Sequence, residues 1–450
     1  MIHCFEVNGC KLVFDVHSLS LHRVDDLVWD ILNGRAPGKG YLPGEVEEAR
    51  HEIEELRRAG VLFAPDPIVT YEPPETPLKS LCLNVAHSCN LACRYCFAGS
   101  GRYGSGPALM PREVGRRAVE MLLERSGTRR RLEIDFFGGE PLLNFEVVQD
   151  IVTYARERAA AVGKEINFTL TTNGVLLDDA VGEFLLKEAV NVVLSIDGRP
   201  GVHDRMRPTP DGRGTHNLII SRARRFAERW DQWSGTKGYF YVRGTYTRHN
   251  LDFDADYRYL ADFGFRHISI EPVVSEDNEY GLREEDLSAV SKAYQRLAED
   301  YLARVRQGRR VRFFHFEVDL DGGPCLPKLL SGCGAGQAYL AVAANGTLYP
   351  CHQLVGQENF KIGDVFRGVN NSTIPRSFTA AHVYAKEHCR SCWAKYLCSG
   401  GCHAGAYLVN RDIYKPNRIS CAIMRARLET ALYVKAVETL LAVSKHSEEA

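Results

Sequence analysis

The sequence predicts an α/β protein built on a parallel sheet that closes, fully or partly, into a barrel. A small module precedes this barrel and a cysteine-rich domain follows it. Strand and helix patterns alternate from Leu81 to about Val274, as they do in parallel sheets. Five prolines within residues 65–79 predict a stiff extended linker ahead of the barrel. Eight of the 14 cysteines lie between Cys325 and Cys421, which marks off the third region.

The N-terminal module spans residues 1–64. Its hydrophobic residues alternate on both sides of an Asn-Gly dipeptide at residues 8–9, which is typical of a two-residue β-hairpin. Apolar residues then recur at helical spacing over 24–32 and 45–58, and residues 61–63 have the pattern of a short strand. This order of elements suggests a winged helix-turn-helix type of fold.

The barrel is predicted over residues 80–310. Its strand patterns are 81–86, 132–137, 166–172, 192–196, 239–246 and 267–273. Amphipathic helix patterns lie between them, and a further helix is predicted over 284–307. The result is a partial (β/α)6 barrel resembling a TIM barrel. Loops that follow the strands then converge at one end, where such barrels bind their ligands.

Residues 311–425 contain glycines, cysteines and turns in place of a regular pattern, and they predict a compact irregular domain. A last helix is predicted over about 421–444. Residues 426–450 therefore form a C-terminal helix and tail.

Composition is that of an ordinary globular protein, with 56 basic and 57 acidic residues and a formal net charge of −1. This balance does not favour nucleic acid or a membrane surface as a partner. We find no pattern of a secretory signal or a membrane span, so the expected compartment is cytoplasmic. Clustered cysteines in a reducing compartment usually hold metal. Cys4, Cys10 and Cys82 stand apart and are expected to be buried free thiols.

Cys89, Cys93 and Cys96 follow directly after the first barrel strand. Three thiolates at this spacing can hold three irons of a 4Fe–4S cluster and leave the fourth iron open to a substrate or cofactor. The alternative is a zinc site, for which His87 could supply the fourth ligand.

The next three strands also end in small or polar residues. The second ends in Gly138-Gly139-Glu140-Pro141, the third in 171–174 (Thr-Thr-Asn-Gly) and the fourth in 195–198 (Ser-Ile-Asp-Gly). Glycine allows close approach to the backbone, and a carboxylate can accept a hydrogen bond from a ligand ammonium group. These ends predict a binding site at the rim of the barrel.

On these motifs, residues 81–275 resemble the radical S-adenosylmethionine (SAM) superfamily. The resemblance implies that Cys89, Cys93 and Cys96 bind a catalytic 4Fe–4S cluster. It implies reductive cleavage of SAM to methionine and a 5′-deoxyadenosyl radical, which abstracts hydrogen from a substrate. The residues that it assigns to the SAM site are Tyr95, Phe97, Gly138, Gly139, Glu140, Asn173, Ser195, Arg207 and Val273.

The later cysteines follow the pattern Cys333-x12-Gly346-x4-Cys351, then Cys389-x2-Cys392-x5-Cys398-x3-Cys402, and finally Cys421. This resembles the seven-cysteine SPASM domain. The resemblance implies two auxiliary 4Fe–4S clusters, one bound by Cys389, Cys392, Cys398 and Cys421 and the other by Cys333, Cys351 and Cys402. The fourth ligand of the latter is either Cys325 or a substrate thiolate at an open iron. A zinc ribbon is the alternative for the Cys-x2-Cys pair.

SPASM enzymes mostly modify peptides, so the N-terminal module discriminates among them. It resembles the RiPP recognition element (RRE), in which the leader of a ribosomally made precursor peptide adds as a strand to a sheet edge. A DNA-binding winged helix is the alternative, but the predicted helix 45–58 carries six glutamates that phosphate would repel.

Over nearly its whole length the chain resembles maturases of six-cysteine (SCIFF) peptides, which are sactipeptide-type enzymes. The hairpin at 5–16, Gly-Gly-Pro-Cys at 322–325, and Tyr-Pro-Cys-His-Gln at 349–353 carry this resemblance. It implies a thioether between a cysteine sulfur and a carbon of a partner residue in a Cys-rich precursor peptide. It also implies an external electron donor such as flavodoxin or ferredoxin.

Three other functions compete with this one. An anaerobic sulfatase maturase shares the barrel and SPASM parts, but there an aspartate base follows the equivalent of Cys351, where this chain has His352. His352 is a base or fills a polar niche. An iron–sulfur regulator with a winged helix would need no SAM pocket, and an electron-transfer protein would need no barrel.

Overall fold

The structure is a computed structural model that describes residues 1–36, 38, 40–68, 70–233, 238–274, 279–320 and 326–448. Side chains are described as far as residue 443. Cys325 and the Gly-Gly-Pro before it lie outside these ranges. In the described part of the chain, no helix combines the length and the apolar character that crossing a membrane requires.

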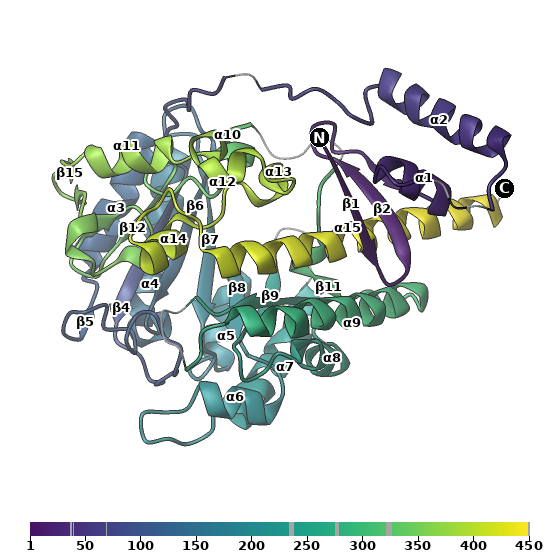
Figure 1. Ribbon diagram of the computed structural model, residues 1–450. Helices are drawn as coiled ribbons and strands as arrows, with labels where there is room; N and C mark the ends of the chain where they lie inside the picture. Colours follow the sequence, from purple (N-terminus) through teal and green to yellow (C-terminus); the bar gives the residue numbers. More distant parts are fainter. Residues whose placement is uncertain are drawn as a thin grey trace.

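Six parallel strands form the centre of the molecule, as predicted. They are β4 (Ser80–His87), β6 (Arg131–Gly138), β7 (Glu165–Thr172), β8 (Asn191–Ser195), β9 (Phe240–Tyr246) and β10 (His267–Pro272), and each pairs with the next. Helices follow each strand and cover one face of the sheet (Figure 1). They are α3 (Arg112–Arg125), α4 (Phe145–Ala161), α5 (Asp179–Lys187), α6 (Pro200–Met206), α7 (His216–Trp233), α8 (Phe253–Asp262) and α9 (Leu287–Arg306). The predicted α/β fold is therefore confirmed.

The sheet extends beyond these six strands at both edges. β11 (Arg312–Phe313) pairs in parallel with β10, so the barrel sheet continues past the predicted boundary at residue 310. On the other side, β12 (Tyr339–Val342) pairs in parallel with β4. β13 (Thr347–Tyr349), β14 (Gly363–Asp364) and β15 (Gly368–Val369) follow it, and β5 (Ala108–Leu109) pairs with β4. The cysteine-rich region thus shares the barrel's sheet, which its residue pattern did not indicate.

The N-terminal module is a three-stranded antiparallel sheet with two helices. Its elements are β1 (Ile2–Val7), β2 (Cys10–Asp15), β3 (Leu21–Arg23), α1 (Asp26–Leu32) and α2 (Pro43–Arg58). The predicted hairpin and both helices are confirmed, and Asn8 and Gly9 have φ of 48° and 73°, as a tight hairpin turn requires. The predicted strand at 61–63 is wrong: the chain bends there, and Val61 N donates to Leu56 O. The third strand is β3 instead.

The remaining helices lie in the cysteine-rich region. They are α10 (Leu326–Ser331), α11 (Thr373–Ala380), α12 (Glu387–Arg390), α13 (Lys395–Cys398), α14 (His403–Asn410) and α15 (Arg418–Glu448). Short 3₁₀ helices occur at Pro141–Asn144, Glu284–Asp286, Phe314–Phe316, His352–Leu354, Glu358–Phe360 and Val383–Ala385.

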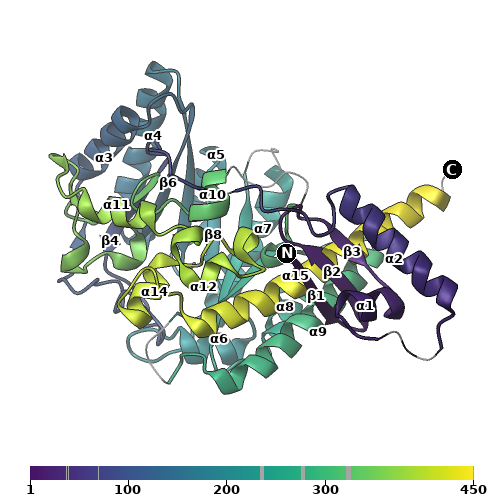
Figure 2. The ribbon, with the colours of Figure 1, turned by 45° about the horizontal axis from the view of Figure 1, so that its top comes forward.

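Helix α15 connects the two ends of the molecule, since it runs from the cysteine-rich region to the N-terminal sheet (Figures 1 and 2). Phe14 of β2 and Leu432 of α15 belong to one buried apolar cluster. The His3 ring stacks on Trp393 with centroids 4.0 Å apart, and its Nε2 atom lies 2.9 Å from Glu429. The N-terminal module therefore packs directly against the cysteine-rich region.

Candidate functional site

The loop after β4 carries Cys89, Cys93 and Cys96 and lies at the carboxyl end of the sheet. Its backbone bonds to the end of α6 and to the segment after it: Ala92 N donates to Pro208 O and Arg94 N to Met206 O, at 2.8 and 2.9 Å. A cavity of about 140 Å³ opens beside the three cysteines. Its lining includes these predicted site residues: Cys89, Cys93, Cys96, Tyr95, Phe97, Gly138, Gly139, Asn173, Ser195 and Arg207.

The three cysteines of this loop are half-buried. Burial raises the pKa of Cys89 to about 12 and raises that of Cys93. A protein pocket of this kind disfavours a free thiolate, whereas bonding to iron would stabilise it. Cys89 Sγ accepts from Leu91 N at 3.4 Å and lies 3.7 Å from Nδ2 of Asn173.

His87 is engaged elsewhere, which disfavours the zinc alternative. Its Nδ1 lies 3.3 Å from Ser105 Oγ, and its Nε2 lies 3.3 Å from the Ala344 N–H of the cysteine-rich region. Both ring nitrogens therefore have partners other than cysteine. Burial also lowers the pKa of His87, so the ring is neutral and accepts the Ala344 proton.

Gly138 and Gly139 are required by close backbone packing. A Cβ atom on Gly139 would lie 2.1 Å from Ser88 O, and one on Gly138 would lie 2.4 Å from Ala86 O. Gly138 also has a φ of 135°, which other residues rarely adopt. The glycines thus bring the end of β6 against the backbone that leads into the cysteine loop, and they leave room at the cavity.

Glu140 and Val273 lie outside the cavity lining. The Glu140 carboxylate is completely buried and accepts from Leu142 N, Thr172 Oγ1 and Asn173 N at 2.8–3.0 Å. It therefore fixes the end of β7 relative to the end of β6. Val273 N donates to Tyr246 O at 2.9 Å. Direct contact of these two residues with SAM stays a prediction.

Tyr95, Asp197 and Arg207 form a buried polar network at the cavity. The Tyr95 hydroxyl donates to the Asp197 carboxylate at 2.8 Å and accepts from Arg207 Nη1 at 2.7 Å. Burial raises the pKa of Asp197 to about 6, and the Arg207 charge opposes that rise. The Nε atom of Arg207 is buried, and no hydrogen-bond acceptor for it lies among the described residues. A carboxylate-bearing cofactor such as SAM fits this donor, and the cysteine triad fits a cluster with one open iron.

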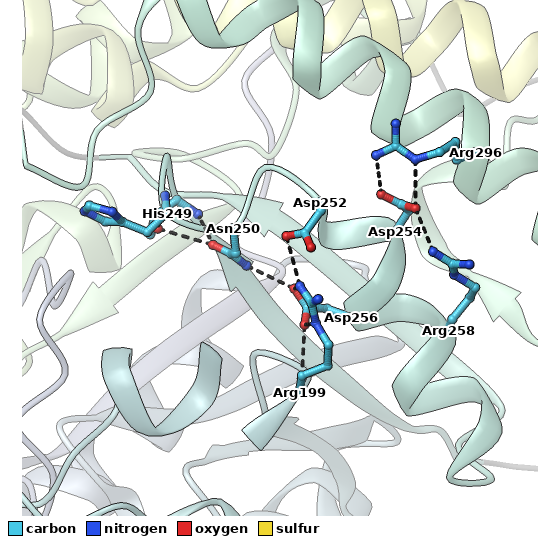
Figure 3. A network of polar contacts seen from close by, with 9 residues as sticks. Arg199, His249, Asn250, Asp252, Asp254, Asp256, Arg258 and Arg296 are labelled. Atoms are coloured by element: carbon cyan, nitrogen blue, oxygen red, sulfur yellow. Dashed lines mark hydrogen bonds and ion pairs between the residues drawn. The ribbon is translucent and has the colours of Figure 1, made fainter. Parts of the chain in front are cut away.

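Helix α8 contacts the segment that follows β8 through a network of polar side chains (Figure 3). Asp256 is fully buried and accepts from Arg199 Nε at 2.7 Å and Asn250 Nδ2 at 3.2 Å, and Arg199 also pairs with Asp252 at 2.9 Å. A Cβ atom on Gly198 would lie 2.3 Å from the Asp256 side chain. This network fixes the backbone that presents Ser195 to the cavity.

The cysteines of the C-terminal region fall into two groups. Burial raises the pKa of the Cys398 thiol to about 12, and Cys421, Cys389 and Cys392 add to the rise. Burial likewise raises the pKa of the Cys351 thiol, and Cys402 and Cys333 add to that rise. Binding of one cluster by the four-cysteine set and of another by the three-cysteine set stays a prediction. Cys333 and Cys402 of the three-cysteine group are exposed, whereas Cys351 is buried.

His352 lies between the cavity and the three-cysteine group. Its ring centroid is 5.2 Å from that of Phe137, which lines the cavity, and its Nδ1 is 3.9 Å from Cys351 Sγ. The Tyr339 hydroxyl lies 2.7 Å from the same nitrogen. Burial and the Arg243 charge lower its pKa to about 4. The residue is thus a neutral group in an aromatic niche.

Several site residues were not assigned from the sequence. Phe137 and Thr171 line the cavity, and Asn90 accepts from Asn173 Nδ2 at 2.7 Å. Phe137 and Thr171 lie near the carboxyl ends of β6 and β7, and this position could have identified them as site residues from the sequence. Asp197 contributes to the site by accepting a hydrogen bond from Tyr95. The two residues are 102 positions apart in the sequence, so no local pattern predicts this contact.

Comparisons with known proteins agree with this geometry. Residues 83–230 match the family model of the radical SAM superfamily. The cysteine-type anaerobic sulfatase-maturating enzyme of Clostridium perfringens (strain 13 / Type A) is 26% identical over 345 residues, which are 72% of this chain and 89% of the relative.

Two solved structures share the fold. Native anSMEcpe with bound AdoMet aligns with a TM-score of 0.64 at 23% identity, covering 80% of this chain and 99% of its own. Streptococcus suis SuiB bound to the precursor peptide SuiA aligns with a TM-score of 0.52 at 16% identity, covering 93% of this chain and 98% of its own. Residues 83–230 therefore match the radical SAM superfamily, and the chain shares its fold with these two solved structures.

Proposed function

We propose that this enzyme matures a ribosomally made, Cys-rich precursor peptide by forming a thioether between a cysteine sulfur and a carbon of a partner residue. Residues 1–64 bind the leader of the precursor, and the barrel and the SPASM region act on its core. The carbon loses one hydrogen atom to the 5′-deoxyadenosyl radical that SAM supplies at its cluster. The sulfur loses one proton, one C–S bond forms, and one electron passes to an auxiliary cluster.

At the SAM site, Cys89, Cys93 and Cys96 hold the cluster. Arg207 offers its unpartnered Nε donor to the SAM carboxylate, and Tyr95 and Asp197 hold that guanidinium in place. Asn173, Ser195, Phe97 and the backbone of Gly138 and Gly139 surround the remainder of the cofactor. An external flavodoxin or ferredoxin provides the electron that cleaves SAM.

The observation that carries peptide recognition is the free edge of the N-terminal sheet. β3 is an edge strand. Ser20 O and Val24 N bond to β2, so by alternation the backbone groups of Leu21 and Arg23 point away from it. A groove of about 430 Å³ runs along this edge, with Ala436 and Thr439 of α15 as the opposite wall. An extended peptide can add here as a fourth strand beside a helix.

The extent of the structural matches supports this assignment. SuiB, solved with a precursor peptide, covers 93% of this chain, whereas anSMEcpe covers 80%. The difference is of the size expected if SuiB alone matches much of the N-terminal module.

The three-cysteine group supports the thioether product. With Cys333, Cys351 and Cys402 as ligands, a cubane has one iron left for a substrate thiolate. Exposure of Cys333 and Cys402 leaves that group accessible. Cysteine sulfur bound in this way is deprotonated and held in a fixed position.

A second candidate is an anaerobic sulfatase maturase, which the 26% identity to the Clostridium perfringens enzyme favours. His352 counts against it, because a neutral imidazole in an aromatic niche stands where that family has an aspartate base. The N-terminal module also counts against it.

The two candidates are separated by a substrate comparison. Reconstituted enzyme receives SAM, reductant and either a Cys-rich precursor with its leader or a sulfatase-derived cysteine peptide. A loss of two hydrogens from the precursor, with a fragmentation pattern that places a cross-link at cysteine, supports thioether formation. Conversion of the sulfatase peptide to its formylglycine form, with an unchanged precursor, would establish the second candidate.

A further inference from the structure

Lys386 is a buried cation of the cysteine-rich region. The side chain lies directly before α12, and the residue is 1% exposed. Its Nζ atom donates to Gly400 O at 2.8 Å. Among the described residues, no aspartate or glutamate forms an ion pair with it. A buried ammonium group without a counter-ion is costly, so its surroundings call for negative charge.

The position of Gly400 places this charge between the two cysteine groups. Gly400 lies midway along the Cys398–Cys402 segment, whose two cysteines belong to different groups. In addition, Cys389 N donates to Lys386 O at 2.9 Å, which ties the backbone of Lys386 to the four-cysteine group. The ammonium group thus lies against the segment that joins the two ligand sets.

The electrostatics agree with the geometry. Burial lowers the pKa of Lys386, and the charges of Cys389, Cys398 and Cys421 in one group and Cys402 in the other oppose that effect.

We infer that Lys386 is a shared counter-charge for the two auxiliary iron–sulfur clusters and that it raises the reduction potential of both. A thiolate-ligated cluster is anionic and gains one further negative charge when it is reduced. A fixed cation nearby stabilises the reduced form more than the oxidised form, and net local charge is one of the main determinants of cluster potential. The consequence for the proposed reaction, on which this inference rests, is that both clusters accept an electron more readily.

The test measures potentials, not turnover. A Cys89→Ala/Cys93→Ala/Cys96→Ala background removes the SAM-binding cluster, so a redox titration followed by electron paramagnetic resonance reports the auxiliary clusters alone. Lys386→Met should lower the midpoint potential of both clusters by the equivalent of at least a tenfold change in the reduction equilibrium, about 59 mV for one electron. Lys386→Arg, which keeps the charge, should stay near the background value.

A matched control comes from the second buried lysine of this region. Lys395 is 3% exposed, but its Nζ lies 2.9 Å from the Asp66 carboxylate. The pair Asp66→Asn/Lys395→Met removes a buried lysine without a change in net charge. It should leave both potentials unchanged.

Unchanged potentials in Lys386→Met that holds about eight auxiliary irons would overturn the inference. If that variant loses iron, Lys386→Gln is measured, since it keeps a donor for Gly400 O, and the same shift is expected. Loss of iron in both neutral variants but not in Lys386→Arg would support the inference. Loss in all three would show that Lys386 only holds the Gly400 loop. Absence of auxiliary iron from the Cys89→Ala/Cys93→Ala/Cys96→Ala protein would overturn the cluster assignment and this inference. It would not bear on SAM cleavage, which is measured with the wild type.

Discussion

The Tyr95 hydroxyl lies 2.7 Å from Nη1 of Arg207 and donates a hydrogen bond to Asp197. Tyr95 is part of the cysteine loop, and Arg207 directly follows α6. This contact therefore sets the position of a buried guanidinium relative to the three cysteines. Arg207 keeps its Nε donor for a ligand, and the burial of the network makes each of its hydrogen bonds expensive to lose.

Tyr95→Phe should weaken SAM binding by roughly 5- to 30-fold, because loss of the hydroxyl costs about 1–2 kcal/mol in a buried network. Iron bound by the triad should not change. Equilibrium binding of SAM to the reconstituted enzyme measures the effect. The control is Tyr154→Phe, which removes a hydroxyl bound to Glu120 on the helical layer. Equal affinity in Tyr95→Phe and wild type would show that the network does not position the SAM ligand.

Gly139→Ala should prevent assembly of the SAM-binding cluster. The added methyl group would lie 2.1 Å from Ser88 O, so the cysteine loop must shift. Iron analysis should show about four irons fewer than wild type. Gly201→Ala on α6 is the matched control, since its Cβ would meet no atom within 4 Å. Full iron content in Gly139→Ala would contradict the packing account.

Arg23→Pro should abolish leader binding while the module stays folded. Proline removes one outward N–H of β3 and leaves the bonds of β3 to β2 in place. Fluorescence anisotropy with a labelled leader peptide should show at least a tenfold higher Kd. The control is His51→Ala on the exposed helix α2, which should bind as wild type does. Unchanged affinity in Arg23→Pro would place the leader elsewhere.

Cys402→Ala should lower the iron content from about twelve to about eight atoms per chain. SAM cleavage by the enzyme without peptide should continue, because the triad is untouched, and thioether formation should stop. Cys4→Ala, which removes a half-buried thiol outside both predicted ligand sets, should keep its iron. Twelve irons in Cys402→Ala would remove this residue from the ligand set.

Asp135→Asn should stabilise the protein at pH 8. Burial, helped by the Glu133 charge, raises the pKa of Asp135 to about 6, although the hydrogen bond with Thr169 opposes the shift. Because this value lies above the unfolded value of about 3.9, the ionised carboxylate costs stability above pH 6 and costs nothing below about pH 4. The expected gain at pH 8 is about 1–2 kcal/mol, seen as a higher thermal midpoint, and it should vanish at pH 4.

Asp150→Asn should change the stability at pH 8 in the opposite direction. Its side-chain bonds to Arg116 lower the pKa of Asp150, so the ionised form contributes stability above the unfolded value that is lost as the pH falls. This variant should be less stable than wild type at pH 8. A loss at pH 8 in Asp135→Asn would contradict the burial argument, and a gain in Asp150→Asn would contradict the stabilising role of the Arg116 pair.

The six barrel strands could be predicted because each has a strand pattern between turn-forming residues. In β6 and β7, for example, apolar buried residues alternate with polar or less buried ones. β3 could not, because three residues give no alternation to detect. Residues 61–63 look like a strand, yet Phe63 adopts a positive φ of 54° as the chain leaves α2. Local pattern thus described long elements well and short connections poorly.

The same contrast holds for the site. The two cysteine groups came from the resemblance of the cysteine pattern to the SPASM domain, and each group stays a prediction. By contrast, Lys386 is one of many lysines in the sequence, and its importance comes from burial beside Gly400. The role of α15 as a groove wall depends on how the two ends of the chain pack. Such contacts arise from tertiary structure, which a residue pattern does not contain.

The central claim is that Cys89, Cys93 and Cys96 support radical cleavage of SAM. Anaerobically reconstituted wild-type enzyme with SAM and dithionite should release 5′-deoxyadenosine, and the Cys89→Ala/Cys93→Ala/Cys96→Ala variant should release none. Wild-type protein that carries about twelve irons and still gives no 5′-deoxyadenosine would contradict the account.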